Sequence, residues 1–150
     1  MQIRFIRHEG FTSLDTLRIR GLCVAFWSIH TRQMSNFGKK YVVGIVGATG
    51  AVGVEIIKCL QEREFPMSEL HLYSSAKSSG KVLATSLGDI LVEEYEVSRA
   101  RVCDFLFLAV SGEFSLANAR LLVAGDGPIV IDNSSAWRYD AEVPLVVCAL

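Results

Sequence analysis

The chain lacks the features that mark several classes of protein. Its longest strongly apolar run, Phe105–Val110, is far too short to cross a membrane. The formal net charge of -1 at pH 7 gives no indication of a nucleic acid or an anionic membrane as a partner. No Cys-x-x-Cys pair occurs, and the cysteines have no metal-site spacing with the three histidines, so neither a disulfide framework nor a metal site is expected from Cys23, Cys59, Cys103 and Cys148.

Acidic residues are scarce in the first 38 positions, which hold five arginines but only Glu9 and Asp15. We expect residues 1–38 to be a poorly ordered leader, either an organelle transit peptide or an upstream extension ahead of a start at Met34. The compartment therefore stays open: cytoplasmic if Met34 is the true start, and plastid or mitochondrial if the leader is a transit peptide. The remainder, 39–150, suits one domain with a buried core, since 51% of the 150 residues are hydrophobic.

Strand and helix patterns alternate along this domain. Continuous apolar runs predict buried strands, and apolar residues three or four apart predict helices. The expected strands are 41–46, 70–73, 104–110 and 129–131, with one more in 82–97, and the expected helices are 51–64 and 111–124. This order predicts an α/β domain with a doubly wound parallel sheet, a Rossmann-like dinucleotide-binding fold.

Each helix should bury one apolar face. In 51–64 that face is expected to contain Val52, Ile56 and Leu60. In 111–124 we expect Leu116, Ala119 and Val123, with Gly125 ending the helix.

Four glycines three apart occupy the first strand-to-helix junction, in "GIVGATGAVG". Gly47 should permit the sharp turn out of the strand, Gly50 the approach of a pyrophosphate, and Gly53 close packing of the helix on the sheet. Gly44 lies inside the strand and is expected to be a packing glycine. A tight turn that binds no ligand is the alternative, but the order strand, turn and amphipathic helix favours a dinucleotide.

No carboxylate ends the second strand, where an NAD-binding domain would carry one to hold the ribose 2′-hydroxyl. Ser75, Lys77 and Ser78 stand there instead. A cation with hydroxyl groups can hold a 2′-phosphate, so the sequence favours NADP. The alternative is that Lys77 is an ordinary solvated lysine in a loop.

Three blocks, "GIVGATGAVG", "EREFPMSELHLYSSAKSSGK" and "IDNSSAWRYDAEVPLVV", resemble the aspartate-semialdehyde dehydrogenase family in order and spacing from about Lys40 to Val147. The resemblance implies the reduction of aspartyl phosphate to aspartate semialdehyde with NADPH, in the synthesis of lysine, threonine and methionine. It also implies a cofactor site formed by Gly47, Thr49, Gly50, Ala51, Val52, Gly53, Ser75, Lys77, Ser78 and Asn133.

The same resemblance implies that Arg138 binds the substrate phosphate. The residues agree, because Arg138 follows the carboxyl end of a predicted parallel strand and carries a permanently charged fork that suits a phosphate. A surface salt bridge is the alternative.

The family's nucleophilic cysteine and its histidine fall beyond Leu150, so no catalytic residue is expected within the chain. Cys148 lies in the apolar run "LVVCAL" and is expected to be a small hydrophobe. The second domain, through which the family dimerises and completes its pocket for the small acyl-phosphate or aldehyde substrate, is also expected to be absent. We therefore expect the chain alone to be inactive. The alternatives are a non-catalytic nucleotide-binding or interaction module and a truncated gene product.

Overall fold

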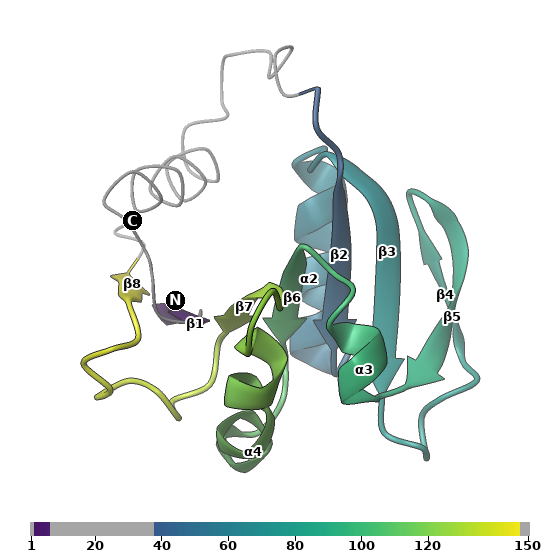
Figure 1. Cartoon of the computed structure of the whole chain (residues 1–150). Coiled ribbons are helices and arrows are strands. Elements are labelled where there is room, and N and C mark those ends of the chain that lie inside the picture. Colours follow the sequence, from purple (N-terminus) through teal and green to yellow (C-terminus); the bar gives the residue numbers. More distant parts are fainter. Residues whose placement is uncertain (1, 7–37, 148–150) are drawn as a thin grey trace.

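The computed structural model describes residues 2–6 and 38–147 (Figure 1). The helices are α2 (Ala51–Glu62), α3 (Val97–Ala100) and α4 (Gly112–Val123), and the strands are β1 (Gln2–Ile6), β2 (Tyr41–Val46), β3 (Met67–Ser74), β4 (Val82–Thr85), β5 (Gly88–Glu94), β6 (Phe105–Leu108), β7 (Ile129–Asp132) and β8 (Leu145–Val147). Within these ranges, no helix has the length and apolar character needed to span a bilayer.

The strands form one sheet in the order β4-β5-β3-β2-β6-β7-β1-β8. The five central strands, from β5 to β7, are parallel, while β4 and β1 pair antiparallel with their neighbours. The chain builds outward from β2 through β3 to β5, and then crosses back to add β6 and β7 on the other side of β2. The order of the strands therefore reverses between β2 and β6, which is where open α/β sheets bind their ligands.

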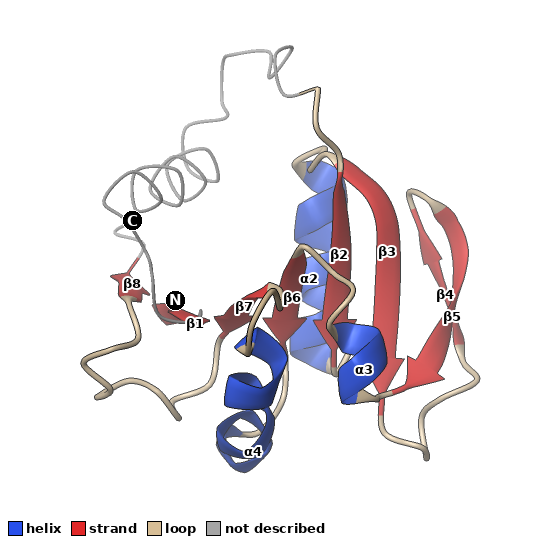
Figure 2. Ribbon diagram, in the orientation of Figure 1, coloured by secondary structure: helices blue, strands red, loops and turns tan. Residues whose placement is uncertain are grey.

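Helices cover both faces of the sheet, with α2 behind it and α3 and α4 in front (Figure 2). Alternate residues of β2 face opposite sides of the sheet. Val43 and Ile45 share a buried cluster with α2, whereas Val46 shares one with α4. The predicted doubly wound α/β domain is confirmed.

The buried face of α2 is rotated from the predicted one. Leu60 is buried as expected, but the other buried residues are Gly53 and Ile57, and Val52 is 42% exposed. The reason is local, because the first turn of α2 lies against the backbone of the preceding turn at Gly53. That contact turns Val52 outward.

The predicted face of α4 is also partly wrong. Ala119 and Val123 are buried as expected, but Leu116 is 55% exposed and Ser115 is fully buried in its place. A buried serine is stable here because its hydroxyl is hydrogen-bonded inside the core. The helix ends before Gly125, as predicted, and this glycine has a positive φ of 59°.

Several elements differ from the predicted ones or were not predicted, among them α3 and β8. Residues 82–94 form a hairpin of β4 and β5 rather than a single strand, and the hydroxyl of Thr85 donates to the carbonyl of Gly88 across its turn (2.8 Å). The segment Gln2–Ile6, assigned above to the leader, pairs antiparallel with β7 on one side and β8 on the other. Residues 7–37 and Cys148 lie outside the described residues, so the expected poor order of the leader stays a prediction there.

Candidate nucleotide-binding site

The turn between β2 and α2 is built around Gly47. Its φ of 83° is a conformation that favours glycine, and a Cβ there would overlap the carbonyl oxygen of Ala109 after β6. The amides of Gly47 and Ala48 both donate to the carbonyl of Tyr73 in β3, at 2.8 and 3.1 Å. The turn is thus fixed between the carboxyl ends of β3 and β6, at the switch point of the sheet.

The other glycines of the motif have different surroundings. A Cβ on Gly50 would meet only the carbonyl oxygen of Gly47, at 3.3 Å, so the space beside Gly50 is otherwise open. A Cβ on Gly53 would overlap that same oxygen and lie 2.8 Å from the Cα of Ala48, so this glycine packs α2 onto the turn. Gly44 packs against Leu106 and Cys103, in line with its predicted role.

The amino end of α2 offers hydrogen-bond donors beside this open space. Gly50 is the N-cap, no side chain caps the helix, and its first turn holds no acid. Among the described residues, no hydrogen bond occupies the amides of Ala51, Val52 or Gly53. Unpaired amides and the positive end of the helix dipole favour an anion at this position.

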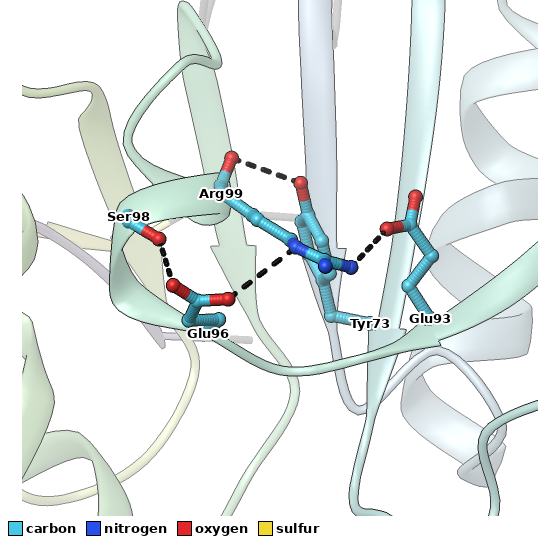
Figure 3. A network of polar contacts seen from close by, with 5 residues as sticks. All are labelled: Tyr73, Glu93, Glu96, Ser98 and Arg99. Atoms are coloured by element: carbon cyan, nitrogen blue, oxygen red, sulfur yellow. Dashed lines mark hydrogen bonds and ion pairs between the residues drawn. The ribbon is translucent and has the colours of Figure 1, made fainter.

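A polar network supports the end of β3 from the α3 side (Figure 3). The Tyr73 hydroxyl donates to the carbonyl of Arg99 (3.0 Å), and the Arg99 guanidinium contacts Glu93 (2.9 Å) and Glu96 (3.4 Å). Burial raises the pKa of Tyr73, so the phenol stays protonated and donates. This network holds the strand whose carbonyl anchors the glycine turn. Sequence analysis missed it because the unclear stretch 82–97 gave no sign of α3.

The predicted 2′-phosphate residues follow β3 in the loop at 75–80. The amide of Ser78 donates to the carbonyl of Ser75 (2.9 Å), which closes a tight turn around Lys77. Ser75 and Lys77 are exposed, Ser78 is half-buried, and no ion pair among the described residues involves Lys77. The loop follows β3 directly, and the carbonyl of Tyr73 near the end of β3 accepts hydrogen bonds from the glycine turn, so the loop and the turn are anchored to the same strand end.

Asn133 and Arg138 lie on the turn that follows β7, separated from β2 in the sheet by β6. Asn133 is half-buried directly after the strand, and Arg138 is exposed, with its backbone amide donating to Ser135 (3.2 Å). All the predicted site residues therefore follow carboxyl ends of parallel strands, along one edge of the sheet. Within the described part of the chain, no group of three or more potential ligands could hold a metal ion.

The sequence matches a known family and several of its members. The model for the family "Semialdehyde dehydrogenase, NAD binding domain" matches residues 42–150. Aspartate-semialdehyde dehydrogenases of Streptomyces akiyoshiensis and Aquifex aeolicus are 47% and 45% identical, over 70% and 71% of this chain but only 30% and 32% of their own lengths.

A solved structure shows the same relation. The aspartate semialdehyde dehydrogenase II of Vibrio cholerae, complexed with ASA, matches with a TM-score of 0.62 and 37% identity. The match covers 69% of this chain and 33% of that one. The chain thus spans about a third of the length of the relatives it matches.

Proposed function

This chain belongs to the semialdehyde dehydrogenase family through its NAD-binding domain, and on that premise we propose that it forms the NADP-binding part of an aspartate-semialdehyde dehydrogenase. A nicotinamide dinucleotide is the cofactor of this domain family. The reaction proposed for the whole protein is the family's reduction of aspartyl phosphate to aspartate semialdehyde, in amino-acid biosynthesis. The family's dimerisation is part of the same proposal.

The open glycine turn carries this proposal. Gly50 is the N-cap of α2, next to the unpaired amides, and a Cβ on it would meet only one protein atom; a pyrophosphate requires both free amides and open space of this kind. We assign the pyrophosphate to Gly47 and the segment 49–53. The bound cofactor would supply the hydride, while the residues of this chain bind and orient it.

The preference for NADP rests on the loop after β3. Ser75, Lys77 and Ser78 offer hydroxyl groups and one cation, and no acid stands among them. We assign them to the 2′-phosphate, since a carboxylate there would repel it. We assign Asn133 to the cofactor and Arg138 to the substrate phosphate, as the resemblance implies.

Two glycine variants test the site. Gly50→Val should abolish NADP binding without unfolding the domain, because its side chain projects into the ligand's space and its Cβ meets only one protein atom, the Gly47 carbonyl oxygen. Gly53→Val should instead lower the free energy of unfolding by about 1–3 kcal/mol, because its side chain is forced against the backbone of the turn. Calorimetric titration and thermal unfolding measure the two effects.

Each outcome has a clear meaning. Normal NADP binding by Gly50→Val would show that the pyrophosphate does not lie at this turn. A Gly53→Val protein as stable as the wild type would contradict the packing role assigned to that glycine.

A further inference from the structure

A buried polar cluster joins the end of β7 to α4. The Asp132 and Ser115 side chains are fully buried, and Trp137 is 4% exposed. One carboxylate oxygen of Asp132 accepts from the hydroxyls of Ser115 and Ser134, each at 2.7 Å, and the other accepts from the amide of Ser134 at 2.9 Å. The Ser115 hydroxyl in turn accepts from the indole N–H of Trp137 at 2.8 Å.

Ser115 is the member that links the two ends of the turn. Its hydroxyl donates to Asp132, where the turn begins, and accepts from Trp137 near the other end of the turn, where the amide of Asp140 donates to the carbonyl of Trp137. Removing this hydroxyl would leave a buried carboxylate with one donor fewer and a buried indole N–H without its acceptor. Unsatisfied buried groups of this kind are costly, so the turn would move to satisfy them.

The outer side of the turn is also held by α4. The Arg120 guanidinium lies 5.3 Å from the centre of the Trp137 ring, and it contacts the carboxylate of Asp140 at 3.3 Å. Trp137 therefore lies between two residues of the same helix, Ser115 and Arg120. The position of the turn is set by α4 as well as by β7.

The two residues assigned to ligands lie on this turn. Asn133 directly follows Asp132, and Arg138 directly follows Trp137, so each is next to a member of the cluster. We propose that Ser115 is a positioning residue, which acts through Asp132 and Trp137 to place Asn133 and Arg138 for binding. This inference rests on the proposed nucleotide-binding function.

A double-mutant cycle with Asn133 tests the proposal in the full 150-residue chain. Ser115→Ala, Asn133→Ala and the double variant are titrated with NADP by calorimetry, and their thermal unfolding is measured in parallel. Ser115→Ala should weaken NADP binding about three- to tenfold in the wild-type background, and have little effect on affinity once Asn133 is alanine. Its effect on the melting temperature should persist in both backgrounds.

A matched control separates positioning from general weakening of α4. Asn118→Ala removes hydrogen bonds of the same helix to Tyr95 and Phe114 but does not touch the turn. It should lower the melting temperature and leave NADP affinity unchanged. If Ser115→Ala does not fold, Trp137→Phe replaces it in the cycle, since it removes the indole hydrogen bond to Ser115 along with part of the buried ring, and the same dependence on Asn133 is expected.

The outcomes separate the positioning role of Ser115 from the proposed nucleotide-binding function on which it rests. An equal loss of affinity from Ser115→Ala in both backgrounds, or no loss at all, would overturn the positioning role while leaving nucleotide binding intact. Failure of the wild-type chain to bind NADP would overturn both.

Discussion

At the scale of single residues, two backbone oxygens explain why two of the positions are glycine. The carbonyl of Gly47 leaves no room for a side chain on Gly53, while Gly47 itself is pressed against the carbonyl of Ala109. The turn is therefore closed on two sides by backbone atoms, which do not yield as a flexible side chain would. Beside Gly50, by contrast, the space is open.

Lys77 gives the sharpest residue-level prediction. Lys77→Glu should weaken NADP binding about ten- to a hundredfold, because one charge-assisted hydrogen bond is lost and the new carboxylate repels the 2′-phosphate. Affinity for NAD should barely change. Lys81→Glu is the matched control, since it makes the same change in charge at an exposed lysine farther along the loop. Equal losses for both nucleotides would show that Lys77 does not contact the 2′-phosphate.

The burial of Cys103 leads us to expect that the free energy of unfolding depends on pH. Burial raises the pKa of this thiol from its ordinary value of 9.0 to about 12. Above about pH 9 the unfolded chain releases a proton that the folded chain retains, so the free energy of unfolding should fall as pH rises from about 9 to about 12. Denaturant unfolding at several alkaline pH values measures this fall.

The comparison variant for that experiment is Cys103→Ala. Its free energy of unfolding should fall less steeply over the same interval, since one of the groups that titrate differently in the two states has been removed. Identical slopes for the two proteins would contradict the assigned effect of burial.

At the scale of elements, the sequence could predict strands and helices wherever hydrophobicity dominates. The strands β2 and β6 are nearly continuous apolar runs because both of their faces are covered, and this pattern is visible in the sequence. The hairpin of β4 and β5 was missed because Asp89, Glu93 and Glu94 interrupt its pattern. The face of α4 was misassigned at Ser115, because its partners Asp132 and Trp137 are distant in sequence.

The position of β1 between β7 and β8 leads to a prediction about hydrogen exchange. Among the described residues, β8 pairs only with β1, and β1 covers the open edge of β7. A shorter chain starting at Met34 lacks β1, so the amides of β7 that face this edge should exchange at least about tenfold faster. The amides of Val43 and Ile45 at the centre of the sheet serve as internal controls. Unchanged protection of β7 in the shorter chain would show that β1 does not pair with it in solution.

At the scale of the whole molecule, the candidate site follows from topology. The strand order reverses between β2 and β6, and there the glycine turn touches Ala109. The sequence could predict this edge as the site, because the motif fixes which strand comes first and right-handed crossovers fix the rest. It could not predict β1, since pairing of a leader segment with β7 depends on contacts across more than a hundred residues.

The central claim is that this domain binds NADP in preference to NAD, and titration of the 150-residue chain with each nucleotide tests it most directly. The chain spans about a third of its relatives' length but holds every residue assigned to the cofactor. Isothermal calorimetry should show one binding site per chain, with NADP binding at least about tenfold more tightly than NAD, as one charge-assisted contact to the 2′-phosphate predicts. Equal affinities, tighter binding of NAD, or no binding of either nucleotide would contradict the account.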